Sequence, residues 1–206
     1  MGMRLLRHYL PLLASSGAMV AALYAALDQG TVQRLSIATG YAALALLAFT
    51  LSVGPLRALR GRRLPLSIHL RRDAGICTAV VGLTHVVLGL QVHHGGAIQR
   101  YFTTLDRGGL ANWIGLAATL LLVLLLGLSS DLAIRRLGSR RWKRLQRLAY
   151  ALFALVVAHT ILYQLIEERA VALVGAAAAV TGATVALQLA GARRRARRPP
   201  PQPTRG

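Results

Sequence analysis

Cysteine is nearly absent from this chain of 206 residues, which contains Cys77 alone. A single thiol excludes a disulfide framework or a thiolate metal cluster within one chain. The pattern G-x-G-x-x-G is also missing, and the segments between the long apolar stretches are short. We therefore expect no NAD- or flavin-binding domain in this chain.

Acidic residues are scarce as well, with 6 Asp and Glu against 25 Lys and Arg and a formal net charge of +19. In a soluble protein this excess would indicate nucleic-acid binding. Here the bases occupy short blocks, and between them lie six long stretches without any Asp, Glu, Lys or Arg. We therefore expect no nucleic-acid partner.

The uncharged stretches predict membrane helices. Each has at least 19 residues, and about 20 residues suffice for a helix to cross a bilayer. The predicted fold is all-α, a polytopic membrane protein whose six-transmembrane-helix bundle occupies residues 1–192. The predicted helices span about residues 8–27, 35–56, 74–92, 110–130, 148–166 and 170–192.

The basic residues predict the orientation of this bundle. Of the 25 Lys and Arg, 21 lie in the two terminal segments and in the second and fourth connections, and 4 lie in the other three connections. The positive-inside rule therefore places both termini in the cytoplasm. A cleaved signal peptide is the alternative for the first stretch, because Arg4 and Arg7 precede it.

The last segment, RRRARRPPPQPTRG at residues 193–206, is strongly basic and rich in proline. Such a composition cannot form a packed core, so we expect a disordered cytoplasmic tail. Its bases are expected to lie against anionic headgroups of the membrane lipid.

Two of the six histidines fall well inside predicted membrane helices, where ionisable residues are costly and usually mark function. His85 comes 13 residues after Arg72, and His159 comes 12 residues after Arg147. At about 1.5 Å per residue, both imidazoles lie roughly 18–20 Å from the cytoplasmic boundary. The two helices run in the same direction, so the two side chains are predicted to meet at one depth.

A depth-matched histidine pair suits a haem iron, which has two axial positions that imidazole nitrogens can fill. An apolar surround also favours the neutral imidazole that binds iron. Gly82 and Gly89 stand at i−3 and i+4 from His85 and would leave space for a flat macrocycle. The same glycines equally suit close helix packing. For each histidine, a hydrogen bond to a neighbouring helix is the alternative to metal ligation.

The segments RRDAGICTAVVGLTH and SSDLAIRRLGSRRWKRLQRLAYALFALVVAH resemble the ferric-reductase-like transmembrane domain family. Within that family they are most similar to the MsrQ or YedZ group, the haem-binding membrane subunits of bacterial periplasmic methionine sulfoxide reductase systems. The resemblance covers about residues 70–165, and the block RRLGSRRWKRLQRL is fairly specific for this group.

The resemblance implies a multi-pass protein of the bacterial inner (cytoplasmic) membrane that holds haem b and transfers electrons. His85 and His159 correspond to an axial ligand pair for the haem iron. Relatives carry a further histidine 13 residues before the fifth-helix ligand, a position that is Gln146 in this chain. Glutamine is a poor haem ligand, so one haem is expected.

The resemblance also implies where electrons enter and leave. Arg71 and Arg72 match inner-side positions of the family, and their charge suits the phosphate of FMN. Membrane topology and lipid contact are the alternative roles for these arginines. The expected donor is a membrane quinol or a flavin reductase, with a quinone or FMN as a second cofactor. The expected acceptor is a periplasmic reductase subunit or ferric iron.

Two other functions remain open at this point. The chain could be a haem-free membrane scaffold or assembly factor, or a small transporter that uses His85 and His159 for protons or a metal ion. Under the haem hypothesis the chain is an oxidoreductase membrane subunit of the ferric-reductase-like kind. The terminal catalytic centre then lies in a partner, so no catalytic residue is predicted here.

Overall fold

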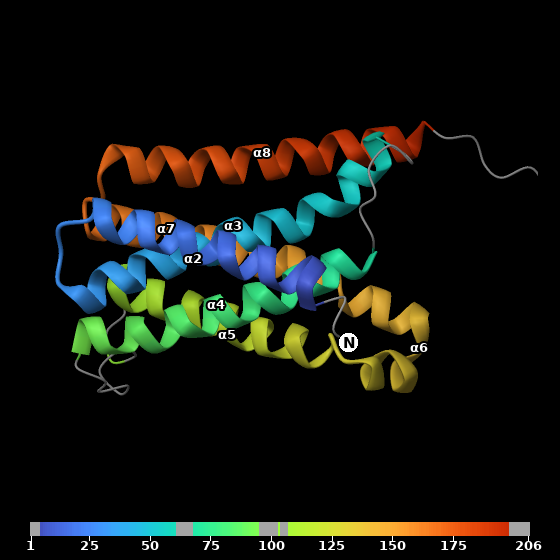
Figure 1. Cartoon of the computed structure of the whole chain (residues 1–206), viewed down its shortest axis with the longest axis horizontal. Coiled ribbons are helices and arrows are strands. Elements are labelled where there is room, and N and C mark those ends of the chain that lie inside the picture. The colour runs from blue at the N-terminus through green and yellow to red at the C-terminus, as the bar shows by residue number, and fades with distance from the viewer. Residues whose placement is uncertain (1–4, 61–67, 95–102, 104–106, 198–206) are drawn as a thin grey trace, which may run out of the picture.

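The computed structural model describes residues 5–60, 68–94, 103 and 107–197. All the regular structure in these residues is helical (Figure 1). The elements are the π-helical turn η1 (Leu5–Tyr9), α2 (Leu10–Ala26), α3 (Thr31–Arg60), α4 (Ile68–His94), α5 (Arg107–Gly127), α6 (Asp131–Leu145), α7 (Leu148–Ile166) and α8 (Val171–Ala196).

Six helices in the described part of the chain are long and apolar enough to cross a membrane, which confirms the predicted six-helix membrane fold. Several helices extend beyond the uncharged stretches. α4 begins at Ile68 rather than at residue 74, and α3 and α8 continue into basic segments. Arginine is a good helix former, and bases near a helix C-terminus complement its dipole. The first residues of the predicted tail are therefore helical, and residues 198–206 lie outside the described residues.

Helix α3 is the centre of the bundle and the most buried of the six membrane helices in the described part of the chain. It packs extensively against α4 on one side and α8 on another, with α2 as a further neighbour. α5 packs mainly against α7. Figure 1 shows α8 as an outer helix along α3 and shows α6 beyond one end of the bundle. We call this end of the bundle the α6 end.

Pro55 interrupts the hydrogen bonding of α3, because proline has no N–H to donate to the carbonyl of Leu51. Gln188 of α8 supplies the missing donor, with its Nε2 2.7 Å from the Leu51 oxygen. Gly191 allows this close approach, since a Cβ there would lie 2.8 Å from the Pro55 Cβ and 2.9 Å from its Cα. One polar contact and one backbone contact thus fix α8 against α3.

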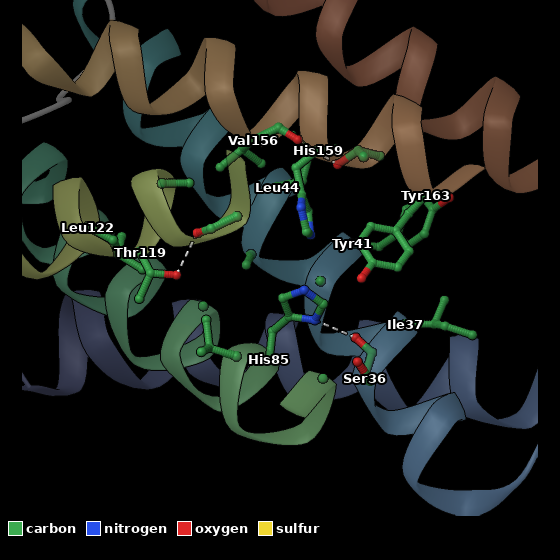
Figure 2. A pocket seen from close by; sticks show the side chains of 18 of the residues that line it. Ser36, Ile37, Tyr41, Leu44, His85, Thr119, Leu122, Val156, His159 and Tyr163 are labelled. Carbon is green, nitrogen blue, oxygen red and sulfur yellow. Dashed lines mark hydrogen bonds between the residues drawn. The ribbon is translucent and has the colours of Figure 1, made fainter. Parts of the chain in front are cut away.

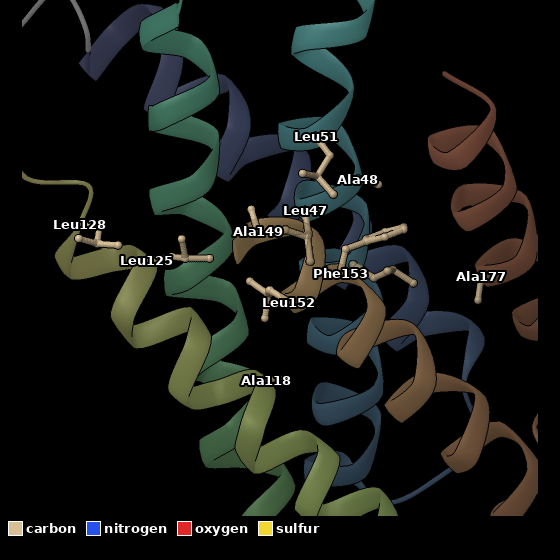
Figure 3. Packing of buried hydrophobic residues seen from close by; sticks show 11 residues of the cluster. Leu47, Ala48, Leu51, Ala118, Leu125, Leu128, Ala149, Leu152, Phe153 and Ala177 are labelled. Carbon is tan, nitrogen blue, oxygen red and sulfur yellow. The ribbon is translucent and has the colours of Figure 1, made fainter. Parts of the chain in front are cut away.

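A cluster of buried apolar side chains packs between the helices of the bundle (Figure 3). It extends from the α6 end, where Leu128 and Ala149 stand close to either end of α6 in the chain, toward the middle of the bundle. We call it the inner cluster. Its members are Leu44, Leu47, Ala48, Leu51, Ala118, Leu125, Leu128, Ala149, Leu152, Phe153 and Ala177.

Helix α6 lies in the basic segment between the fourth and fifth predicted membrane helices, where the sequence predicts a connection and no helix. Ser130 caps its N-terminus by accepting a hydrogen bond from the Ala133 N–H at 3.1 Å. Gly138 bends it with φ 71° and ψ 156°, a conformation essentially restricted to glycine. Trp142 donates from Nε1 to the Leu128 carbonyl at 2.8 Å and thereby ties α6 to the end of α5.

The start of the chain is joined to α4 by a polar cluster. Asp73 is fully buried and accepts hydrogen bonds from His8 Nδ1 at 2.6 Å and from the Tyr9 hydroxyl at 3.0 Å. The neighbouring Arg72 pairs with Asp131 at 2.5 Å and connects α4 to α6. These contacts all lie near the α6 end, where α4 begins.

Candidate functional site

His85 of α4 and His159 of α7 face each other across a cavity of about 430 Å³ between α3, α4, α5 and α7. Their ring centroids are 6.3 Å apart, and the ring planes are inclined by 80°. Figure 2 shows the two imidazoles pointing toward one another from opposite walls. The structure therefore brings together the two histidines that the sequence placed at one depth.

Each imidazole is hydrogen-bonded to a main-chain carbonyl of another helix, which is α3 for His85 and α5 for His159. His85 Nδ1 lies 2.8 Å from the oxygen of Ser36 on α3, and His159 Nδ1 lies 2.9 Å from the oxygen of Ala111 on α5. A carbonyl oxygen can only accept, so Nδ1 carries the proton in both rings. The lone pair then belongs to Nε2. The hydrogen bond to a neighbouring helix, the alternative for each histidine, is therefore present, and it engages Nδ1 rather than Nε2.

Two glycines lie directly behind these imidazoles. A Cβ at Gly40 would stand 3.0 Å from both Cε1 and Nδ1 of His85, and a Cβ at Gly115 would stand 2.9 Å from the same atoms of His159. Sequence reasoning missed both, because they lie on helices that carry no candidate ligand. The signal would have been a small residue on a neighbouring helix at the depth of each histidine.

The predicted glycines Gly82 and Gly89 both line the cavity. A Cβ at Gly82 would come within 2.9 Å of the Leu122 Cδ2, so its close neighbour is a side chain of α5. A Cβ at Gly89 would make an ordinary contact, 3.7 Å from the Ser36 Oγ. The close neighbour of Gly82 is thus the end of a flexible side chain, and the predicted role of both glycines beside a macrocycle remains a prediction.

The site fits a group that binds two imidazoles through one metal. A metal–nitrogen bond is about 2 Å long, and the ring centroid lies about 1 Å beyond the ligating nitrogen. Two imidazoles on opposite sides of one metal therefore have centroids about 6 Å apart. The measured separation is 6.3 Å, and the ring tautomers direct the Nε2 lone pairs to that role. Apolar side chains such as Leu44, Leu122 and Val156 line the space between the helices.

The end of the cavity away from α6 is polar. Tyr163 lies one turn beyond His159, with its ring centroid 4.9 Å from the imidazole, and its hydroxyl donates to Asn112 Oδ1 at 2.6 Å. Gln164 Nε2 donates to the Tyr41 hydroxyl at 3.0 Å. An ion pair between the side chains of Arg169 and Glu167 completes this polar end.

The structure does not bring Arg71 and Arg72 to this cavity. Both lie in the first turns of α4, more than three helical turns before His85, and neither is among the lining residues. Arg72 pairs with Asp131 of α6. Their predicted contact with a phosphate-bearing cofactor remains a prediction, and it concerns a surface separate from the histidine site.

The fold and the site together describe a membrane protein with six spans and a pair of opposed histidines on α4 and α7. A model of the family described as ferric reductase like transmembrane component matches residues 39–157, more than half of the chain. The chain belongs to this family. The matched segment includes Gly40, His85 and Gly115, and His159 lies two residues beyond it.

Individual relatives agree with this assignment. The protein-methionine-sulfoxide reductase heme-binding subunit MsrQ of Ralstonia nicotianae is 35% identical over 129 residues, 59% of this chain and 54% of that protein. MsrQ of Azospira oryzae is 32% identical over 139 residues, 65% of this chain and 56% of that protein. The chain thus spans little more than half the length of these relatives.

A shorter similarity joins the chain to the magnetosome protein MamZ of Magnetospirillum gryphiswaldense. The two are 49% identical over 49 residues, which are 24% of this chain and 8% of MamZ. No solved structure matches the chain at a significant level.

Proposed function

We propose that this chain is a b-type haem protein that transfers electrons within the bacterial inner membrane, with His85 and His159 as the axial ligands. One observation carries the proposal: two imidazoles oppose each other at 6.3 Å, and each is fixed through Nδ1 to a carbonyl. A metal-binding histidine is usually oriented in this way by a hydrogen bond from its other ring nitrogen. The relatives named heme-binding subunits support the same cofactor.

The haem would supply a one-electron couple between ferric and ferrous iron. The chain's own residues hold the two imidazoles opposed, and most of the walls around them are apolar. Tyr163 packs against His159 and limits the tilt of that ring. An apolar lining of this kind would influence the redox potential of a bound haem by limiting solvent access.

The position of the cavity sets the direction of transfer. The sequence puts 21 of the 25 bases in segments predicted to be cytoplasmic, and α6 belongs to one of these segments. The positive-inside rule therefore puts the α6 end in the cytoplasm and the two histidines in the outer half of the membrane. The inner cluster extends from the α6 end to the cavity, and Leu44, Leu47 and Leu152 belong to both. We therefore propose a single haem that delivers electrons outward, to a periplasmic reductase subunit or to ferric iron.

The electron donor follows from the same arrangement. His85 lies 13 residues, or about 20 Å, from Arg72 at the inner boundary. A quinol dissolved in the membrane can approach closer than a cytoplasmic flavin held near Arg71 and Arg72. A quinol is therefore the favoured donor, and a flavin reductase acting through FMN is the second candidate.

The proposed function is tested on the purified, haem-supplemented protein. We expect a Soret band, split α and β bands on reduction, and reoxidation of the reduced protein by a ferric chelate. If a quinol analogue reduces the protein faster than NADH with a flavin reductase does, a quinol is the donor. A protein that stays colourless would contradict the haem assignment and leave the scaffold or transporter functions.

A further inference from the structure

The two histidines dock in the same local way on two different helices. His85 donates to the carbonyl of Ser36, and the residue four positions later on α3 is Gly40. His159 donates to the carbonyl of Ala111, and the residue four positions later on α5 is Gly115. The two turns are far apart in the sequence, so their common geometry is not a consequence of local repetition.

Helix geometry explains why glycine stands at these positions. In an α-helix the carbonyl of one residue accepts from the N–H four residues later, so the side chain of that later residue flanks the carbonyl. A missing side chain at that position makes room for a second donor from another helix, and the Ser36 oxygen also accepts from the Thr39 hydroxyl at 3.1 Å. The distances agree, because a Cβ at Gly40 would meet Nδ1 of His85 at 3.0 Å, the atom that donates. At Gly115 the corresponding distance to His159 is 2.9 Å.

We propose that Gly40 and Gly115 are positioning residues for the two axial ligands, an inference that rests on the proposed haem function. Each glycine lets an imidazole lie against a helix backbone, which fixes the protonated nitrogen and the plane of the ring. The carbonyl bond gives each imidazole more anionic character, which strengthens its donation to ferric iron. The same two contacts hold the ring planes near their 80° inclination.

A methyl group at either position acts on the iron through the histidine. The imidazole must move by a few tenths of an ångström or rotate, and its bond to the carbonyl weakens. With less anionic imidazole the ferric form loses stabilisation, so the midpoint potential rises. Gly115→Ala is expected to have the larger effect, because its contact is the shorter one.

The experiment compares Gly40→Ala and Gly115→Ala with Gly54→Ala and Gly127→Ala. The two control glycines lie on the same helices, and a Cβ at either would meet nothing within 4 Å. All four proteins are purified with haem, and their potentials and low-spin fractions are measured. We expect the controls to match the unsubstituted protein. For Gly115→Ala we expect about a tenfold change in the ferrous-to-ferric ratio, which is about 59 mV for one electron, together with a high-spin fraction.

Equal potentials and spin states in all four variants would overturn the positioning role while leaving the haem assignment intact. Loss of haem from the unsubstituted protein would instead reject the proposed function. A second measurement uses the unsubstituted protein alone. Ring planes held near perpendicular predict a strongly anisotropic low-spin signal in the electron paramagnetic resonance of the ferric haem. The less anisotropic signal of parallel rings would also overturn the inference.

Discussion

At the level of single residues, the sequence predicted the two histidines of the cavity and could not predict what holds them. His85 and His159 were identifiable because charge is absent around them and because their depths can be counted from the nearest bases. Their partners, the carbonyls of Ser36 and Ala111, carry no side-chain signature. A main-chain acceptor can belong to any residue type, so these contacts follow only from the packing of the helices.

Asp73 illustrates the same limit, because a single acidic residue beside a basic block gives no sign of its burial. It is fully buried and binds His8 and Tyr9. Asp73→Ala leaves both partners without their acceptor, and we expect a loss of about 3 kcal/mol in the free energy of unfolding. The free energy of unfolding is measured by titrating the detergent-solubilised protein with a denaturing detergent.

Asp28→Ala is the matched control for this prediction, because Asp28 is exposed near the end of α2. We expect it to change stability by less than about 0.5 kcal/mol. If the two substitutions destabilise the protein equally, the buried cluster does not anchor the start of the chain to α4.

At the level of elements, apolar length predicted the six membrane helices, and their contacts required the structure. Pro55 in α3 is visible in the sequence, but the residue that compensates for it stands 133 positions later, at Gln188. Helix α6 was missed for a related reason. Its basic residues indicated a connection between spans, although the Ser130 cap was present in the sequence as a helix start signal.

The contact between α8 and α3 is tested by Gln188→Leu, alone and combined with Pro55→Ala. Removing the amide leaves the carbonyl of Leu51 without its donor, which costs about 1–3 kcal/mol. In the combined variant the N–H restored at position 55 donates to Leu51, so the amide matters less. We expect the cost of Gln188→Leu, measured by unfolding, to be clearly smaller in that background. Equal costs in both backgrounds would show that the amide does not replace the hydrogen bond that Pro55 removes.

At the level of the whole molecule, the number of haems remains a prediction. The sequence indicated one haem through Gln146, a single residue. An argument from packing points the same way, because Leu51, Leu125, Leu128 and Phe153 pack together toward the α6 end. A second macrocycle there would require opening a close-packed core.

The substitution Gln146→His therefore adds a potential haem ligand without adding space for a second haem. We expect one haem per chain in the variant and in the unsubstituted protein alike, because insertion into the inner cluster would displace several large side chains. Haem extraction and protein quantification on the same sample give the ratio. A ratio of two in the variant would show that residue 146 alone decides the haem count and that the packing does not.

The central claim, that His85 and His159 together hold one iron, is tested most directly by the haem spectrum and haem content of two single variants. His69→Ala is the control, since His69 is exposed at the start of α4. We predict that His85→Ala and His159→Ala each lose the low-spin spectrum and most of the bound haem, while the control keeps both. A low-spin spectrum and one haem per chain retained in either cavity variant would contradict the account.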